Sequence, residues 1–279
     1  MCKDCGCAAP DEHRLHDSTG GQVDVTVRRR DPSVTHLVAD LLDANRKEAL
    51  HNREHFDRHG VLAINLMSSP GAGKTSLLEA TIDRLGTELA IAVIEGDLET
   101  QNDANRIKAK GVPAIQINTG SACHLDAVMV HDALHHLELD DLDVVFIENV
   151  GNLVCPAAFD LGQHFNVTLL SVTEGDDKPS KYPVMFRGSD LVVLTKTDLL
   201  PYLEEFSPAR AAAALKASGY GGPLFETTAR RSEGQSGWIE WLRKTVAERR
   251  RGDRGSKLAG VEKRYHTHVH PVSAAGRRP

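Results

Sequence analysis

Residues 68–75 read Ser-Ser-Pro-Gly-Ala-Gly-Lys-Thr, and this stretch decides the fold of the chain. It follows an aliphatic run at 61–67 and precedes a helical pattern at 75–85. A glycine-rich turn between a strand and a helix that ends in Gly-Lys-Thr is typical of a phosphate-binding P-loop. Position 68 is Ser where the pattern usually has glycine, a substitution that other P-loops tolerate.

Each residue type in this loop has a role in phosphate binding. Backbone N–H groups converge on phosphate oxygens, and the helix N-terminus adds a favourable dipole. Lys74 is expected to neutralise the β- and γ-phosphates, and Thr75 to place its hydroxyl on Mg²⁺. The predicted phosphate-binding residues are Gly71, Ala72, Gly73, Lys74, Thr75 and Ser76.

Working outward from the loop, short aliphatic runs alternate with amphipathic segments. Continuous Val, Ile and Leu runs without polar alternation indicate strands buried on both faces of a parallel sheet. The alternation predicts a doubly wound α/β domain with a mostly parallel sheet. Strands are expected at 61–67, 89–94, 114–117, 143–147, 167–172, 191–194 and, more weakly, 223–226; helices are expected at 32–60, 75–85, 101–110, 124–137, 207–217 and 234–249.

Composition sets the domain organisation and excludes some functions. The chain has 279 residues, 41% of them hydrophobic, and a net charge of -6. This charge disfavours general binding to nucleic acid or to anionic membranes. No apolar stretch is long enough to span a bilayer or resembles a secretory signal, so we expect a cytoplasmic protein. We predict a flexible arm at 1–32, a P-loop domain at 33–249 and a disordered basic tail at 250–279.

Two downstream motifs favour guanine over adenine. Thr195-Lys196-Thr197-Asp198 follows the aliphatic run 191–194. A carboxylate at Asp198 can accept hydrogen bonds from the guanine N1–H and 2-amino group, a pair that adenine does not offer. Lys196 is expected to pack across the base and the P-loop. The segment 228–230 resembles a second guanine motif, in which the backbone N–H of Ala229 contacts the guanine oxygen.

Two strand ends between these motifs are candidate nucleotide switches. Asp97 follows the run 89–94 and could reach Mg²⁺ through water. Glu148 follows the run 143–147, and Gly151 would offer its N–H to the γ-phosphate. Together with Lys74, Asp97 and Glu148 are the predicted catalytic residues. The alternative is that 148–151 is only a turn at a strand end.

Soft metal ligands lie beside these switches. Cys123 and His124 are predicted at the start of a helix, where a thiol has a lowered pKa, and Cys155 comes soon after Gly151. If their strand ends are neighbours, the three side chains can converge on Ni²⁺ or Zn²⁺. The alternative is that both cysteines are small buried hydrophobes. On the same segment His131, His135 and His136 are expected to be solvated, with His131 as a further candidate ligand.

The first seven residues carry three more cysteines, at Cys2, Cys5 and Cys7. Thiolates on a flexible arm suit square-planar Ni²⁺, although a redox dithiol remains an alternative. Scattered histidines at both ends of the chain are expected to be solvated rather than metal-buffering; these are His13, His16, His266, His268 and His270.

These motifs, taken together and in this order, resemble the hydrogenase nickel incorporation protein family, HypB. The resemblance covers roughly 34–245 plus the arm. The segments that carry it are MCKDCGC (1–7), NLMSSPGAGKTSLL (65–78), EGDLETQNDANRI (95–107), CHLDA (123–127), ENVGNLVCP (148–156), VTEGDDKPSKYPVMF (172–186) and TKTDLLPYL (195–203).

The resemblance implies a GTPase that forms a GTP-dependent dimer across its nucleotide sites, as relatives of the nitrogenase iron protein do. It implies Cys2, Cys5 and Cys7 as one nickel site, and Cys123, His124 and Cys155 as a second site at the dimer interface. It implies nickel delivery to the large subunit of [NiFe]-hydrogenase with a nickel-binding accessory protein. Lys178 or Lys181 may then reach nucleotide across the dimer. The tail beyond about residue 250 departs from the family pattern.

The resulting mechanistic hypothesis is that GTP and Mg²⁺ order the switches, and that hydrolysis relaxes the 148–155 segment and releases nickel. Three alternatives stay open. A urease-type nickel-insertion GTPase typically carries Cys-Pro-His, whereas Ala157 follows Cys155-Pro156 here. A nickel buffer with a vestigial nucleotide site and an ATP-using kinase are the others.

Overall fold

The computed structural model describes residues 15–16, 22–23, 32–97, 102–120, 122–228 and 232–250. Its centre is a seven-stranded, all-parallel sheet in the order β5-β4-β6-β3-β7-β8-β9. The sheet strands are β3 Leu62–Ser68, β4 Ile91–Asp97, β5 Ala114–Asn118, β6 Val144–Glu148, β7 Phe165–Ser171, β8 Leu191–Thr195 and β9 Leu224–Glu226.

Strand order changes direction beside β3, which lies between β6 and β7. In open α/β sheets, ligands bind outside the carboxyl ends of the strands at such a switch point. The P-loop leaves the carboxyl end of β3, so the sequence motif stands where this topology favours binding. A separate antiparallel pair joins β1 Leu15–His16 to β2 Gln22–Val23.

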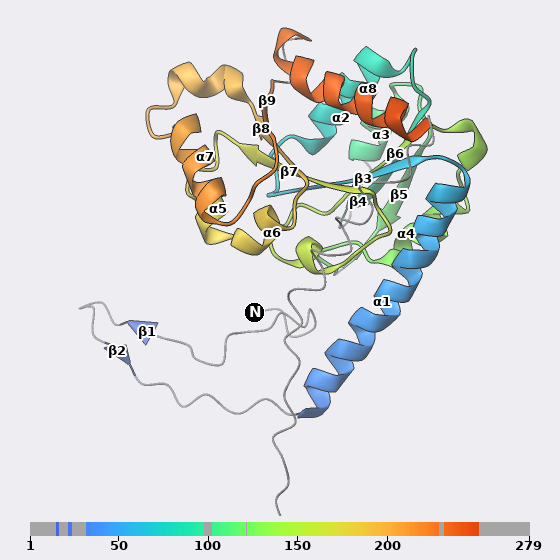
Figure 1. Cartoon of the computed structure of the whole chain (residues 1–279), viewed down its shortest axis with the longest axis horizontal. Helices are drawn as coiled ribbons and strands as arrows, with labels where there is room; N and C mark the ends of the chain where they lie inside the picture. The colour runs from blue at the N-terminus through green and yellow to red at the C-terminus, as the bar shows by residue number, and fades with distance from the viewer. Residues whose placement is uncertain are drawn as a thin grey trace, which may run out of the picture.

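Helices cover both faces of the sheet, as Figure 1 shows. On one face α2, α3 and α8 pack on a cluster that includes Ile64, Phe146 and Trp238. On the other face α1 and α4 contribute Phe56 and Val130 to a second cluster. The helices are α1 Pro32–Arg58, α2 Lys74–Leu85, α3 Asn102–Lys108, α4 Ala127–Leu134, α5 Lys178–Lys181, α6 Pro183–Arg187, α7 Pro208–Ala217 and α8 Ser236–Arg250, with 3-10 turns η1 Leu139–Asp141, η2 Cys155–Ala158, η3 Thr197–Tyr202 and η4 Ser232–Gln235.

The predicted doubly wound α/β class is confirmed, with every predicted strand within two residues of its expected start. Among the helices in the described part of the chain, none combines the length and hydropathy that a bilayer span requires. Cys2, Cys5, Cys7 and Ala229 lie outside the described residues, as do nearly all of the predicted arm and the predicted tail after Arg250.

Helix α1 has about the predicted length but docks only through its later turns. In its first half, Leu41 and Leu42 are 60% and 38% exposed. Docking begins further along, where Asn45 and Asn52 are buried and bridge the neighbouring segments. The helix projects past the sheet in Figure 1, so its first turns have little domain surface to pack against.

The expected helix at 124–137 begins three residues later, at Ala127. The Asp126 side chain accepts a hydrogen bond from the Met129 N–H, and Asn45 Oδ1 accepts one from the Ala127 N–H. A side-chain oxygen that accepts from a first-turn N–H defines a helix N-terminus. Cys123 and His124 therefore lie in the segment before α4, and the expectation that they start the helix is wrong.

Candidate functional site

The P-loop joins β3 to α2 in a conformation set by its glycines. Gly71 and Gly73 have φ of 73° and 100°, a region that side-chain-bearing residues rarely adopt. Lys74 and Thr75 are buried, and Lys74 Nζ donates to Ser68 Oγ over 3.2 Å. Ser76 Oγ accepts from Arg106 Nη2 at 3.2 Å. The loop is thus already folded, with its ammonium group at the end of the sheet.

Two buried carboxyl groups stand next to Thr75. Its hydroxyl donates to Glu148 Oε1 at 2.8 Å, and Glu148 on β6 is paired in register with Glu95 on β4. Burial raises the pKa of Glu148 to about 7. Burial and then the Glu148 charge raise the pKa of Glu95 to about 8. Each carboxyl has one buried oxygen, Oε2, without a hydrogen-bond partner among the described residues.

Buried carboxylate oxygens are destabilising unless a proton or a cation compensates them. A hard divalent cation prefers such oxygens together with a hydroxyl. The group Thr75, Glu148 and Glu95 therefore fits Mg²⁺. Asp97, the residue expected to approach Mg²⁺, ends β4, and its charge further raises the pKa of Glu95. Sequence analysis did not select Glu95, although the strand end that carries it was identified.

Glu148→Gln is expected to stabilise the nucleotide-free protein at high pH. Because the folded-state pKa of Glu148 exceeds its ordinary 4.5, the folded state binds more protons than the unfolded state between pH 4.5 and 7. Stability from this group is present at low pH and lost as pH rises through about 7. The free energy of unfolding of the variant minus that of wild type should increase by roughly 2 to 3 kcal/mol from pH 5 to pH 8. Urea unfolding measures it.

Glu138→Gln, at an exposed carboxyl, is the matched control and should follow wild type at every pH. An unchanged difference between Glu148→Gln and wild type across this pH range would show that Glu148 is not the buried neutral group described.

Residues of the predicted guanine motif gather beside the P-loop. Lys196 has a left-handed backbone, with φ of 58°, and its Nζ donates to Gly71 O at 2.7 Å. Thr195 Oγ1 donates to Ala72 O at 2.7 Å. Asp198 Oδ1 accepts from the Thr228 hydroxyl at 2.7 Å, which fixes one oxygen of this carboxyl. The predicted contact between Lys196 and the P-loop is present.

The three predicted soft ligands converge. Cys123 Sγ lies 3.1 Å from Cys155 Sγ and 3.8 Å from His124 Nδ1, and all three donor atoms are within 4.8 Å of one another. Neither cysteine is in a disulfide. Burial lowers the pKa of His124, so its imidazole is neutral and able to offer a lone pair. Two thiolates and an imidazole form a donor set for a borderline divalent ion such as Ni²⁺ or Zn²⁺.

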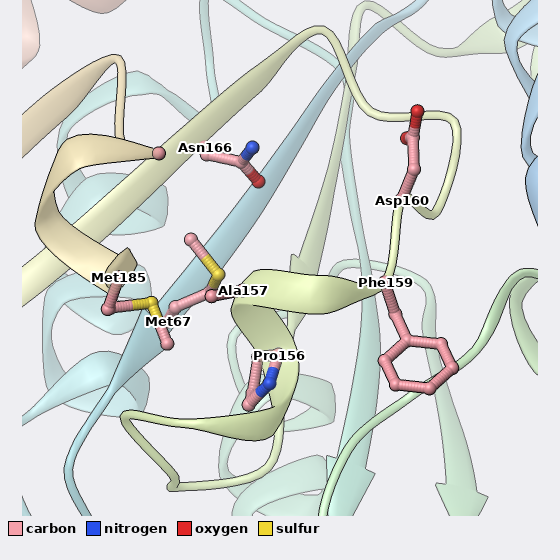
Figure 2. Close-up of a pocket in the computed structure, with 8 residues that line it drawn as sticks. Met67, Pro156, Ala157, Phe159, Asp160, Asn166 and Met185 are labelled. Carbon is pink, nitrogen blue, oxygen red and sulfur yellow. The ribbon is translucent and has the colours of Figure 1, made fainter. Parts of the chain in front are cut away.

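Packing holds this cluster from one side. The His124 ring stacks on Phe159, with ring centroids 3.9 Å apart. Cys155 opens the η2 turn, and Figure 2 shows Pro156 and Ala157 of this turn over Met67 and Met185, with Phe159 directed away from them. Phe159 was not selected from the sequence, because stacking across a turn leaves no local pattern.

The segment 148–155 joins the nucleotide site to the metal cluster. Gly151 lies against the P-loop, where an added Cβ would be 2.8 Å from Pro70 Cα. Asn149 Oδ1 accepts from the Leu125 N–H at 3.1 Å, and Asn152 Nδ2 donates to Cys123 O at 3.3 Å. Asn149 and Asn152 both belong to the segment 148–156, but no role was predicted for either side chain. The segment therefore contacts the P-loop and the backbone on either side of His124.

The strand ends that lead to the ligands are not neighbours, because β4 lies between β5 and β6. The cluster forms because the chain after β5 crosses the end of β4. Thr119 N donates to Asp97 O at 2.9 Å, and the Leu125 side chain lies against Gly96. This crossing carries Cys123 over one strand to reach Cys155.

Lys178 and Lys181, the candidates for contact across a dimer, lie on the short helix α5. Lys181 Nζ pairs with Asp177 Oδ2 at 2.5 Å, and Lys178 Nζ lies 5.5 Å from the centre of the Tyr182 ring. His131 lies away from the cysteine cluster, in a separate group with His51 and His55.

Comparison with known proteins places this site in a family. The sequence profile described as CobW/HypB/UreG, nucleotide-binding domain, matches residues 62–218. The hydrogenase maturation factor HypB of Azotobacter vinelandii is 52% identical over 217 residues, covering 77% of this chain and 69% of that protein. HypB of Escherichia coli K12 is 47% identical over 232 residues, covering 83% and 79%.

The structural comparison agrees with the sequence comparison. The crystal structure of HypB from Helicobacter pylori in complex with nickel superposes with a TM-score of 0.70 at 38% identity, covering 74% of this chain and 96% of that one. The chain therefore belongs to the CobW/HypB/UreG family of nucleotide-binding proteins, and its resemblance to HypB extends from the sequence motifs to the fold.

Proposed function

We propose that this chain is a cytoplasmic GTPase that binds nickel and uses GTP hydrolysis to deliver it for maturation of [NiFe]-hydrogenase. The observation that carries the proposal is the 148–155 segment, which touches Thr75 at one end and Cys123 at the other. Two findings support this proposal. The relatives' description as hydrogenase maturation factors supports the role in hydrogenase maturation, and the nickel complex of the H. pylori protein supports nickel as the cargo.

Guanine selection rests on Asp198, whose carboxyl is held by Thr228. The base would stack beside the Lys196 stem, and the backbone N–H of Ala229 would meet the guanine oxygen. Adenine presents no donor pair to a carboxylate at this position, so GTP is the expected nucleotide.

Phosphate binding and hydrolysis are assigned to residues around the P-loop. Lys74 and the backbone of 71–76 would neutralise the phosphates, while Gly151 would report on the γ-phosphate. Thr75, Glu148 and Glu95 would hold Mg²⁺, with Asp97 able to act through water. Bound Mg²⁺ would supply charge neutralisation on the β- and γ-phosphates. Positioning of this kind accounts for most of phosphoryl-transfer catalysis.

Nickel release follows from the same contacts. With the γ-phosphate present, the 148–155 segment is held against Pro70 and keeps Cys155 beside Cys123. Loss of the γ-phosphate frees the 148–155 segment and separates the thiolates of Cys123 and Cys155. We further propose a GTP-dependent homodimer that shares the Cys123, His124 and Cys155 site, with Lys178 or Lys181 reaching across. The N-terminal Cys2, Cys5 and Cys7 would form an independent nickel site, and an accessory protein and the hydrogenase large subunit would be the partners.

Lys74→Ala is expected to reduce GTP turnover by about 100-fold, since one lost charge-stabilising donor typically costs 10²–10³ in rate. Phosphate release from purified protein with GTP and Mg²⁺ measures this effect. The matched control is Lys244→Ala, an exposed lysine on α8, which should keep wild-type turnover.

Equal turnover in Lys74→Ala and wild type would contradict the assignment. Absence of turnover in both, with nickel binding retained, would favour a nickel buffer with a vestigial nucleotide site.

A further inference from the structure

Two helices on one face of the sheet bring four histidines together. On α1, His51 and His55 are four residues apart; His131 on α4 and His135, which caps that helix, have the same spacing. Residues at this spacing share one face of a helix. The His51 and His131 ring centroids lie 4.7 Å apart across the helix pair. One ring nitrogen from each of His51, His55 and His131 lies within 4.8 Å of the others.

Distances within the group match those between ligands of one ion. His51 Nε2 lies 3.2 Å from His55 Nε2, and His131 Nε2 lies 3.1 Å from His135 Nε2. Two imidazole nitrogens at 2.0–2.1 Å from a tetrahedral ion are roughly 3.3 Å apart. Within each pair, the two nitrogens therefore need little movement to bind the same cation.

The surrounding hydrogen bonds orient lone pairs into the group. Asn52 Nδ2 donates to Ala127 O and Leu161 O, which leaves Asn52 Oδ1 as an acceptor. His131 Nδ1, 3.1 Å from that oxygen, must then carry the proton, so its Nε2 carries the lone pair. This is the arrangement that metal-binding histidines usually show, with the second ring nitrogen donating to a fixed acceptor.

Glu48 provides a second acceptor of the same kind. Its Oε1 lies 3.4 Å from both His51 Nδ1 and His131 Nδ1. A proton on His51 Nδ1 leaves the His51 Nε2 lone pair facing His55.

We propose that His51, His55 and His131, with His135 beside His131, form a metal site that binds a borderline divalent transition ion, Ni²⁺ or Zn²⁺, through imidazole nitrogens alone. Imidazole suits both ions. The donors, the helices and the outer carboxylate Glu48 all differ from those of the Cys123, His124 and Cys155 cluster, and the two groups are separate in the structure. A bound ion would bridge α1 to α4, and thus fasten the helix that follows His124.

The test is metal binding by the full-length chain without nucleotide. Equilibrium dialysis against Zn²⁺, and separately against Ni²⁺, gives the number of bound ions and their affinities. Wild type is compared with His51→Ala/His55→Ala and with His136→Ala, the matched control at an exposed histidine next to the group. Circular dichroism in a chelator confirms that each variant is folded.

The double variant should bind one ion fewer than wild type, whereas His136→Ala should match wild type. Glu48→Gln should keep the ion but bind it about 10-fold more weakly, the effect typical of an outer-shell partner. If the double variant is unfolded, the single variant His51→Ala is measured instead, and its affinity for this ion must be lower than that of wild type by more than about 10-fold.

The proposal is overturned for both metals if wild type and the His51 variants bind equal numbers of ions with equal affinity. A loss of equal size in His136→Ala would also overturn it, since binding would then be diffuse. The readout is independent of the proposed GTPase function, because the histidine-dependent ion should persist in Cys123→Ser/Cys155→Ser.

Discussion

Asp198→Asn is expected to change the preferred nucleotide from GTP to XTP. Asp198 Oδ1 accepts from Thr228, and in the proposed site Oδ2 would accept from the base. Guanine offers two donors there, the N1–H and the 2-amino group. An Asn side chain would present an NH₂ group to one of them, which leaves donor against donor. Xanthine has an oxygen in place of the 2-amino group and can accept from that NH₂.

The effect should be large because a buried polar group left without a partner is costly. Sites built on hydrogen bonds to the substrate reject a mismatched analogue by about 10⁴- to 10⁵-fold. We expect the ratio of GTP to XTP affinity to change by at least about 1000-fold, as measured by competition with a fluorescent nucleotide. Glu204→Gln, at an exposed carboxyl in the loop after η3, is the control and should keep the preference for GTP. If Asp198→Asn still prefers GTP as strongly as wild type does, the base does not bind at Asp198.

Cys155→Ser is expected to remove the nickel ion at the cluster with Cys123 and His124. Serine has nearly the volume of cysteine, but its hydroxyl stays protonated at neutral pH and is a poor ligand for a borderline ion. Loss of an outer-shell partner alone typically costs 10- to 100-fold in metal affinity. For a direct ligand we expect a loss of about 1000-fold or more at this site.

Nickel titration of the chain lacking the arm cysteines and carrying His51→Ala/His55→Ala isolates this cluster from the proposed histidine site. Val154→Ser is the matched control, because Val154 is 51% exposed, adjoins Cys155 and has no donor atom in its side chain. Its nickel affinity should equal that of wild type. Retention of full affinity in Cys155→Ser would mean that the thiol pair does not form the site.

The sequence predicted those features that depend on local pattern. Aliphatic runs located the strands because a sheet covered on both faces needs apolar residues throughout. The loop 68–75 was identified because strand, glycines, lysine and helix are adjacent in the chain. Lys196 and Asp198 were identified by the same kind of local motif; in the structure Lys196 contacts the P-loop and Asp198 accepts from Thr228.

Features that depend on contacts between distant segments were harder to predict. The sequence indicated that Cys123 and Cys155 can meet if their strand ends are neighbours. They meet although the strand ends are not neighbours, and strand order is not a local property. Asp97 was favoured over Glu95 because an aspartate at a strand end is a familiar signal. The register of β4 with β6, which places Glu95 beside Glu148, appears only in the folded sheet.

Helix α1 illustrates a different limit. Its period predicted a helix correctly, but an apolar stripe does not show which part of a helix finds a surface to cover. Leu41 is exposed, whereas Asn52 is fully buried because Ala127 O, Leu161 O and His131 engage its amide. The four-histidine group depends on this docking, so the separate i, i+4 pairs gave no indication of it.

The central claim is that the nucleotide and nickel sites share the 148–155 segment, and nickel affinity measured with GDP and with a non-hydrolysable GTP analogue tests it most directly. We predict tighter binding with the analogue, by about 5- to 150-fold, the range of a typical coupling between sites. Asn152→Ala, which removes the hydrogen bond to Cys123 O, should reduce that ratio. Equal nickel affinity in the two nucleotide states would contradict the account, because a ligand without differential affinity cannot shift the equilibrium.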